Sequence, residues 1–272
     1  MSTGYALVEA IEPRLKIAYP KPFQLEISKA RGLQRKKQVR IIPSIKYTND
    51  LTCLIHSGDK NSFIWPYWND GFKQNWKSDI PVVWLGQTKT PDFIDKKNSF
   101  ITGNVPWSNG LLSWLQNKCT SRFILYSMED FILIRQVNTE MLKFICDIMK
   151  KNKIGLVKLY TNRQTMIDKI NNRKEFGLLK VRNCMRWLCS CLPSIWSRDL
   201  LIDVLKNGET PWLFEQNGTG RLARMMLQHY AYLDSEVFPF REVIQQGKVK
   251  LSSYRFLRSI NVKPEEKLEC LK

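Results

Sequence analysis

The sequence lacks the features of membrane-bound, secreted and disordered proteins. It has no apolar run of about 18 residues, the length that a membrane-spanning helix needs, so we expect no transmembrane segment. Residues 1–12 lack a basic flank followed by an apolar core, so we expect no signal peptide. With 13 Gly and 12 Pro among 272 residues, the chain is not fibrous or low in complexity. A hydrophobic share of 43% excludes intrinsic disorder and indicates a globular protein.

Cysteine and histidine are sparse and poorly spaced for a metal or redox site. The 7 Cys are an odd number in a long chain, which favours reduced thiols and a cytoplasmic protein. Cys184, Cys189 and Cys191 form no CxxC pair, and neither histidine follows at zinc-finger spacing. The absence of a Walker loop and of GxGxxG argues against kinases, ATPases and NAD-dependent enzymes.

Acidic residues are few relative to basic ones. The chain has 25 Asp and Glu against 43 Lys and Arg, which gives a formal net charge of +18. Such a charge favours nucleic acid, an anionic membrane surface or anionic small molecules as partners. A lysine-rich composition without any basic binding site would give the same number.

Two segments concentrate the positive charge. Residues 29–46 contain seven basic residues and no acid, which fits a solvated connector, a contact with a phosphate backbone, or peripheral attachment to an anionic membrane. Residues 143–186 contain twelve basic residues and three acids, with Tyr160, Phe176 and Trp187 between them. Basic side chains interleaved with rings can hold a nucleic-acid backbone and a splayed base, although a solvated rim would look the same.

Hydrophobic periodicity predicts an α/β protein. We expect strands over residues 51–57, 81–85, 122–126 and 154–159, and helices over 63–76, 109–118, 140–151, 197–206 and 220–229. Ser108 is a predicted N-cap, as is Asn138 or Thr139. Strand, helix and strand within residues 51–85 form a βαβ unit. The expected organisation is a basic arm over 1–50, one domain with a Rossmann-like mixed sheet over 51–250, and a tail over 251–272.

Carboxylates follow several of the predicted strands. Glu129 and Asp130 come directly after an apolar strand, where open α/β sheets bind ligands, and adjacent carboxylates can hold a divalent metal. Asp59 follows the first strand in the same way. Glu215 lies among aromatic residues, where partial desolvation would raise its pKa and suit a general base. Turn-forming acids and a surface glutamate are the alternatives for these positions.

Four blocks of residues, taken in their order along the chain, carry a resemblance to a known family. They are residues 54–59 with 65–68 and 76–81; residues 107–111 with 123–131; residues 192–196 with 200–201 and 208–215; and residues 238–248. In this order, over residues 51–249, the chain resembles the small GT-A-type glycosyltransferases of capsule and surface-polysaccharide clusters and of phages. The family usually has Asp where Glu129 stands, and often an acid where Leu213 stands.

The resemblance implies a GT-A-like fold and transfer of a sugar from a nucleotide-sugar donor, most simply a UDP-sugar, to an acceptor hydroxyl. Catalysis would fall to Glu215, as the base, and Asp130, which would also ligate Mg²⁺ or Mn²⁺ if a metal is used. The donor-binding positions would be Ser57, Asp59, Trp107, Ser108, Glu129 and Arg198. Arginine side chains could neutralise the diphosphate in place of a metal.

The positive charge favours DNA as the acceptor, specifically a 5-hydroxymethylated pyrimidine in phage DNA flipped into the site. The residues expected to contact this acceptor are Lys158, Arg163, Arg182, Arg186 and Trp212. Transfer to a surface polysaccharide or lipopolysaccharide glycan is one alternative. The other is a non-catalytic nucleic-acid-binding protein on the same fold, which the departures at Glu129 and Leu213 would fit.

Overall fold

The structure, a computed structural model, describes residues 50–159, 174–183, 185–225, 227–232, 237–245 and 247–260. These residues belong to one compact unit, Tyr47–Lys272. The basic segment 29–46 and Arg163, for which the sequence suggested a phosphate contact, lie outside the described residues.

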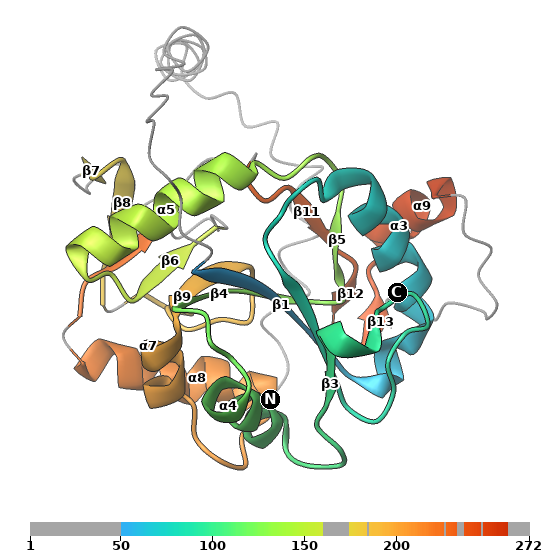
Figure 1. The fold of residues 1–272 in the computed structure, drawn as a ribbon, viewed down its shortest axis with the longest axis horizontal. Coiled ribbons are helices and arrows are strands. Elements are labelled where there is room, and N and C mark those ends of the chain that lie inside the picture. The colour runs from blue at the N-terminus through green and yellow to red at the C-terminus, as the bar shows by residue number, and fades with distance from the viewer. Residues whose placement is uncertain are drawn as a thin grey trace, which may run out of the picture. The chain divides into compact units, whose positions relative to one another are not determined.

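A nine-stranded mixed sheet forms the centre of the fold (Figure 1). Across the sheet its strands are β3 (Ser99–Ile101), β2 (Val82–Gly86), β1 (Leu51–Ser57), β4 (Phe123–Met128), β9 (Ser194–Ser197), β6 (Leu156–Lys158), β10 (His229–Ala231), β8 (Leu178–Val181) and β7 (Lys174–Glu175). The first four strands run parallel, and β9 runs antiparallel to both β4 and β6. The strands from β3 to β4 are therefore all parallel, and β9 is the first strand that runs in the opposite direction.

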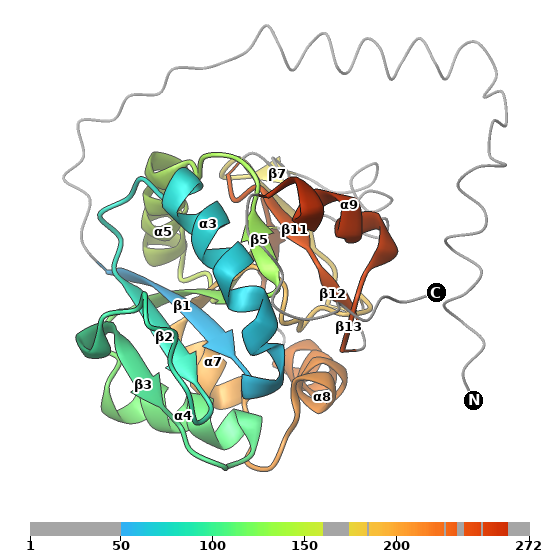
Figure 2. The ribbon, with the colours of Figure 1, turned by 90° about the vertical axis from the view of Figure 1, so that its right-hand side faces the viewer.

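Helices cover both faces of this sheet, so its central strands are buried (Figures 1 and 2). All seven residues of β1 are buried. Leu51, Cys53 and Ile55 face the core shared with α3 (Trp65–Asn75), α5 (Thr139–Asn152) and α9 (Leu251–Ser259). Leu54 faces the core shared with α4 (Trp107–Asn117), α7 (Arg198–Val204) and α8 (Pro211–Arg224). This arrangement confirms the predicted α/β class with a Rossmann-like mixed sheet.

The predicted βαβ unit is present as β1, the short helix η1 (Asp59–Ile64), α3 and β2. Two predicted helix starts are confirmed by their caps. The Asn138 side chain accepts a hydrogen bond from the Met141 N–H at 3.0 Å at the start of α5. The Ser197 hydroxyl accepts one from the Leu200 N–H at 3.3 Å at the start of α7.

Other predicted boundaries are wrong. The helix expected over residues 220–229 is α8, which begins at Pro211 and ends at Arg224, while His229 starts β10. Thr210 caps α8 by accepting from the Leu213 N–H at 3.2 Å, and proline suits the first helical turn. The segment expected to be a tail from residue 251 begins with α9, whose Leu257 is buried in the core.

A short antiparallel pair lies beside the main sheet. Strand β5 (Phe131–Leu133) pairs with β11 (Phe240–Glu242), and β12 (Ile244–Gln245) pairs with β13 (Lys248–Val249); the small helix η2 (Lys96–Asn98) precedes β3. The Val243 N–H donates to the Asp130 carbonyl at 2.9 Å. The turn between β4 and β5 is thereby joined to the C-terminal part of the chain.

Two general expectations can be compared with the described residues. Five of the cysteines, all buried, are free: Cys53, Cys119, Cys146, Cys189 and Cys191. Within the described ranges, the helices are too short or too polar to span a bilayer.

Helix α3 approaches β5 closely at Gly71, and this contact can be tested. A Cβ atom at Gly71 would lie 2.7 Å from the Leu133 carbonyl oxygen and 2.7 Å from Ile132 Cγ2. We expect Gly71→Ala to lower the free energy of unfolding by about 1–3 kcal/mol, because overpacking outweighs the helix propensity of alanine. The matched control is Gly220→Ala in α8, where the nearest atom would be 3.6 Å away. It should stabilise the protein by about 0.5–1 kcal/mol in urea denaturation; two changes of the same sign would contradict the packing argument.

Candidate active site

The candidate site lies at the carboxyl ends of the parallel strands. The register pairs Ser57 at the end of β1 with Gly86 at the end of β2, and His56 with Met128 at the end of β4. The loops that follow these three strands therefore meet at one edge of the sheet, where open α/β sheets bind their ligands. Asp59 stands on the first of these loops, and Glu129 and Asp130 stand on the third.

Glu129 is fully buried in the turn after β4. Its Oε1 accepts a hydrogen bond from Asn61 Nδ2 at 2.7 Å, and within the described part of the chain Oε2 is buried without a partner. Burial raises the pKa of the Glu129 carboxyl, and the hydrogen bond from Asn61 partly offsets this effect. The loop after β1 thus holds the side chain that follows β4.

Asp130 is buried beside Glu129. Its Oδ1 likewise has no hydrogen-bond partner among the described residues. Burial raises the pKa of Asp130 well above its ordinary value, and the negative charges of Glu129 and Glu242 raise it further. Two adjacent carboxylates with unpartnered oxygens form an electrostatically strained pair, which a bound cation would relieve.

The pair fits a divalent cation, although it does not form a complete cage. Carboxylate oxygens are the ligands that Mg²⁺ and Mn²⁺ prefer, and such ions commonly use one or two carboxylates together with substrate phosphates and water. Among the described residues, no group of three or more His, Cys, Asp or Glu side chains is placed to hold a metal. A metal at this site would therefore depend on the substrate for the remaining ligands.

Asp59 and Ser57, both predicted to bind the donor, are already engaged within the protein. The Asp59 carboxylate accepts from the Thr88 N–H at 3.1 Å, from the Thr88 hydroxyl, and from the Lys89 N–H at 3.2 Å. Partial burial opposes these hydrogen bonds, but their net effect is to lower the pKa of Asp59. The Ser57 hydroxyl is buried and accepts from Trp65 Nε1 at 2.8 Å. These contacts fix the loops after β1 and β2 to each other and to α3.

Three rings form a wall next to the strand ends. The rings of His56 and Trp107 stack with centroids 5.2 Å apart and an angle of 13° between their planes, and Tyr126 meets both edge-on. Burial lowers the pKa of His56 to about 3, so its imidazole is neutral at pH 7. The ring of Trp107 also packs against the ring of Phe214 in α8, with centroids 5.2 Å apart. This aromatic wall, formed by His56, Trp107 and Tyr126, connects the strand ends to α8.

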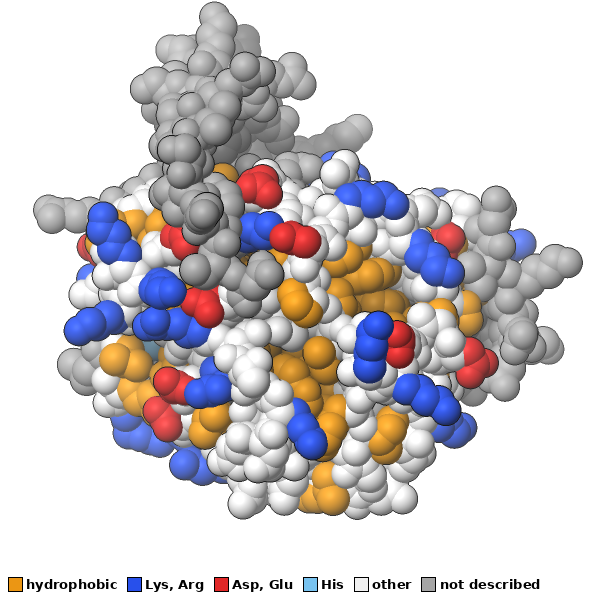
Figure 3. Space-filling view, in the orientation of Figure 1, with side chains coloured by type: hydrophobic (Ala, Val, Ile, Leu, Met, Phe, Trp, Pro, Cys, Tyr) orange, Lys and Arg blue, Asp and Glu red, His pale blue; other side chains and the backbone are white. Residues whose placement is uncertain are grey.

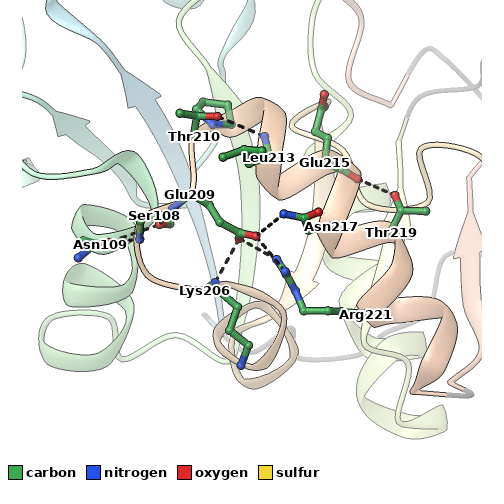
Figure 4. Close-up of polar contacts among 12 residues, drawn as sticks. Ser108, Asn109, Lys206, Glu209, Thr210, Leu213, Glu215, Asn217, Thr219 and Arg221 are labelled. Atoms are coloured by element: carbon green, nitrogen blue, oxygen red, sulfur yellow. Dashed lines mark hydrogen bonds and ion pairs between the residues drawn. The ribbon is translucent and has the colours of Figure 1, made fainter.

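Ser108 does not cap α4 as predicted, because that helix begins at Trp107 with Pro106 at its N-cap. Its hydroxyl instead accepts from the Glu209 N–H at 2.9 Å, and its own N–H donates to the Glu209 carbonyl at 3.2 Å (Figure 4). Asn109 Oδ1 accepts from the Gly208 N–H at 2.7 Å. The start of α4 is thus fastened to the turn that precedes α8.

A buried ion pair secures the same turn. Arg221 donates through Nη1 to Glu209 Oε1 at 2.9 Å and through Nη2 to Oε2 at 2.7 Å (Figure 4). Asn217 Nδ2 and the Lys206 N–H also donate to this carboxylate, each at 3.3 Å. The bidentate geometry, together with the low exposure of both side chains, ties the last turn of α8 to the loop that precedes the helix.

Glu215 lies on α8 and is partly buried. Its Oε1 accepts from the Cys191 N–H at 2.7 Å. Burial raises the pKa of Glu215; the Cys191 hydrogen bond and the Lys158 charge act in the opposite direction, while the Glu242 charge adds to the rise. Tyr126 is within electrostatic range of both Glu129 and Glu215, since both charges contribute to its high pKa after burial. Trp107 meets both Tyr126 of β4 and Phe214, the residue before Glu215, so the end of β4 and the start of α8 lie side by side.

Two of the predicted site residues lie elsewhere. Arg198 follows β9, which runs antiparallel to β4, and Ser197 pairs with Phe123 at the start of β4. Arg198 therefore stands at the opposite edge of the sheet, where its guanidinium donates to the Cys119 carbonyl at 3.0 Å. Lys158 is 2% exposed, and its ammonium donates to backbone carbonyls. We therefore place Arg198 outside the donor site and Lys158 outside the acceptor surface.

The remaining predicted acceptor residues include exposed ones near α8. Trp212 is 51% exposed, and its ring lies 5.5 Å from that of Trp187. The Arg186 guanidinium lies 5.3 Å from the centroid of Trp187. Arg182 is also exposed. We refer to Arg186, Trp187 and Trp212 as the aromatic platform.

Sequence reasoning missed several residues of this site. Asn61, Tyr126 and Glu242 do not stand out in the sequence, because an Asn in a loop, a Tyr in an apolar strand and an isolated Glu are common. Glu242 pairs with Lys250 at 2.9 Å, and both line a cavity of about 360 Å³ beside Leu192. Glu242 falls within the fourth block of the resemblance, residues 238–248, and this position is the one signal in the sequence that could have identified it.

Neither a protein-family model nor a curated protein matches this chain. Among solved structures, residues 1–349 of S. aureus TarS are 14% identical with a TM-score of 0.45, over 68% of this chain and 58% of that chain. The mannosyltransferase PcManGT from Pyrobaculum calidifontis, in complex with GDP-Man and Mn²⁺, is 13% identical with a TM-score of 0.49, over 86% and 68% of the two chains. A cytidylyltransferase from Leptospira borgpetersenii is 12% identical with a TM-score of 0.45, over 71% and 81%. This chain thus spans 58% of the TarS fragment, and its function has to be argued from the site itself.

The buried ion pair of Glu209 and Arg221 gives a stability prediction. Arg221→Met leaves the Glu209 carboxylate buried without its cation, so we expect the free energy of unfolding to fall by about 3 kcal/mol. The matched control is Lys97→Met, which removes the cation of the exposed pair with Asp95 and should change stability little. Equal losses for the two variants in urea denaturation would contradict the role given to the buried pair.

Proposed function

We propose that this protein is a glycosyltransferase that moves a sugar from a nucleotide-sugar donor, a UDP-sugar, to an acceptor hydroxyl. The observation that carries the proposal is the convergence of two kinds of carboxylate on one site. Glu129 and Asp130 lie buried at the end of β4 with oxygens that have no partner among the described residues, and Glu215 follows Phe214, whose ring packs against Trp107 next to Tyr126 of β4. The pair Glu129 and Asp130 suits a diphosphate bound through a cation, and Glu215 suits a base.

In this proposal the donor occupies the edge formed by the loops after β1, β2 and β4. The loops that carry Ser57 and Asp59 would contact the nucleotide, and Trp107 would flank the sugar. Asp130, with Glu129, would hold a divalent metal, which when bound supplies positive charge to the diphosphate leaving group. The aromatic wall would exclude water from the anomeric carbon, which protects the donor from hydrolysis.

Glu215 is the proposed base. It would accept the proton of the acceptor hydroxyl while the hydroxyl oxygen forms a bond to the anomeric carbon. The bond from that carbon to the diphosphate oxygen breaks, and its electron pair leaves with the nucleoside diphosphate. A partly buried carboxylate with a raised pKa is more basic than an exposed one, which matches this role.

For the acceptor we propose a 5-hydroxymethylated pyrimidine in DNA. The aromatic platform supports this choice, because an exposed indole ring beside a half-buried one, with an adjacent guanidinium, can stack an extruded base and contact its backbone. Trp212 precedes Glu215 by three residues, so both side chains lie on the same side of α8. Lys and Arg side chains are spread over the face seen in Figure 3, which favours sequence-independent contact with phosphates.

The first experiment measures nucleotide release from a panel of nucleotide sugars. It is run without DNA, with unmodified duplex and with duplex carrying 5-hydroxymethylcytosine. The mass of the DNA is then measured by mass spectrometry. Release that requires the modified duplex, with a matching mass gain, is expected. Release that does not depend on DNA would support a glycosyltransferase but would overturn DNA as the acceptor, in favour of a glycan.

Absence of release from every donor, together with tight and salt-sensitive DNA binding, would overturn the enzyme in favour of a non-catalytic binding protein. The double substitution Glu129→Ala, Asp130→Ala separates the same classes. An enzyme loses donor turnover in this variant, whereas a binding protein keeps its affinity for DNA.

Glu215→Gln tests the base. We expect kcat to fall by about 10²–10⁴-fold, because proton transfer is lost while the shape of the side chain is kept. The active form of Glu215 is the carboxylate, so wild-type activity should be lost as the pH falls through its raised pKa. The variant should lack this acid limb, and Glu140→Gln, an exposed change on α5, should leave both kcat and the limb unchanged. A wild-type rate in Glu215→Gln would exclude the base.

Trp212→Ala tests the aromatic platform. Loss of one stacking ring should raise the KM for modified DNA about tenfold. The rate of donor hydrolysis without acceptor should not change, because the ring is exposed and separate from the donor loops. Leu213→Ala is the matched control, since that side chain is 41% exposed and next in sequence. An equal rise in KM for both variants would argue against stacking.

A further inference from the structure

Lys158 is a buried cation in β6 that the proposed reaction does not use directly. It is 2% exposed, and its Nζ donates to the Trp187 carbonyl at 2.6 Å and to the Leu188 carbonyl at 3.3 Å. Burial lowers the pKa of Lys158 to about 8, so the ammonium still carries its charge at neutral pH. A buried charge is costly, and one retained at such a position calls for a reason.

The segment that Lys158 holds leads directly to Glu215. Residues 187–191 end at Cys191, whose N–H donates to Glu215 Oε1 at 2.7 Å. Between the two ends, the Cys189 N–H donates to the Thr219 hydroxyl at 3.1 Å, and that hydroxyl donates to the Glu215 carbonyl at 2.7 Å. The same short segment therefore binds the Lys158 ammonium at one end and the Glu215 carboxylate at the other.

The charges around Glu215 single out Lys158. Of the charges that act on the Glu215 carboxyl, Lys158 is the positive one and Glu242 of β11 is the negative one. Burial keeps the Cys189 and Cys191 thiols protonated by raising their pKa values, and Tyr126 is kept neutral in the same way. His229 of β10 has a pKa lowered to about 4 by burial, so it is also neutral at pH 7.

We propose that Lys158 is a positioning residue for Glu215: its ammonium fixes residues 187–191, whose last amide holds the carboxylate, and it supplies a positive charge to the site of that carboxylate. The catalytic consequence rests on the proposed function of Glu215 as a base. The coupling between the two side chains does not, because it follows from the contacts alone.

Three variants separate the two parts of this role. Lys158→Gln removes the charge and keeps a hydrogen-bond donor for the carbonyls, whereas Lys158→Met removes both. Lys143→Gln, which removes a cation of α5 paired with Asp79, is the control. The readout is the pKa of Glu215, measured by ¹³C NMR of the side-chain carboxyls. Comparison with Glu215→Gln assigns the signal.

Both Lys158 variants should raise the pKa of Glu215 by about one unit, because removal of a nearby opposite charge favours the neutral acid. Lys143→Gln should leave it unchanged. In the transfer assay the acid limb of kcat should move to higher pH by the same amount in both variants. Lys158→Met alone should also raise the KM for the acceptor, since it frees residues 187–191.

The wild-type protein provides a measurement that does not depend on the folding of either Lys158 variant. The carboxyl signal of Glu215 should show a second inflection near pH 8, where Lys158 loses its proton. Absence of this inflection, or an unchanged pKa in folded Lys158→Gln, would overturn the proposal. If no donor is turned over by the wild type, the proposed function fails while the NMR titration still decides the coupling.

Discussion

The attachment of helix α8 to helix α4 is the interaction on which the site depends. Ser108 and Glu209 exchange hydrogen bonds through a side chain and two backbone groups, and Arg221 locks the Glu209 carboxylate in a bidentate pair. This junction fixes where α8 begins, and with it the positions of Trp212 and Glu215. It also sets Phe214 against Trp107, so the aromatic wall and the base belong to one rigid unit. The Cys191 amide, which donates to the Glu215 carboxylate, adds a second attachment between α8 and the segment before β9.

Burial is the second constraint, because it acts on every ionisable group of the site in a direction set by the sign of its charge. It raises the pKa values of Glu129, Asp130 and Glu215 and lowers those of His56 and Lys158. A carboxylate can remain charged there only where a neighbour stabilises it. Asn61 does this for Glu129, and the Cys191 amide with Lys158 does it for Glu215. The polar neighbours therefore matter as much as the carboxylates themselves.

The sequence was sufficient for features that are local in the chain. Apolar runs identified β1 and β4, the acids after them marked the strand ends, and Asn138 marked the start of α5. It was insufficient where position depends on strand direction. Arg198 follows a strand, as Asp59 does, but β9 runs antiparallel to β4, so the residue after it stands at the opposite edge. Lys158 looked like part of a basic surface because nothing local shows that residues 187–188 would cover it.

These two kinds of information correspond to the two halves of the site. The half that carries Glu129 and Asp130 comes from consecutive segments, since β1, η1, α3, β2 and β4 follow one another within about eighty residues. The half that carries Glu215 is assembled from residues 187–191, α8 and β11, which meet only in the folded chain. The halves join at Tyr126 of β4, the strand that borders parallel β1 on one side and antiparallel β9 on the other. The strand order β3-β2-β1-β4 reverses between β1 and β4, and open α/β sheets place their ligands at the carboxyl ends of the strands at such a reversal. The antiparallel direction of β9 therefore explains why the sequence-based prediction misplaced Arg198, whereas the order of the parallel strands explains why Glu129 and Asp130 stand at a ligand-binding edge.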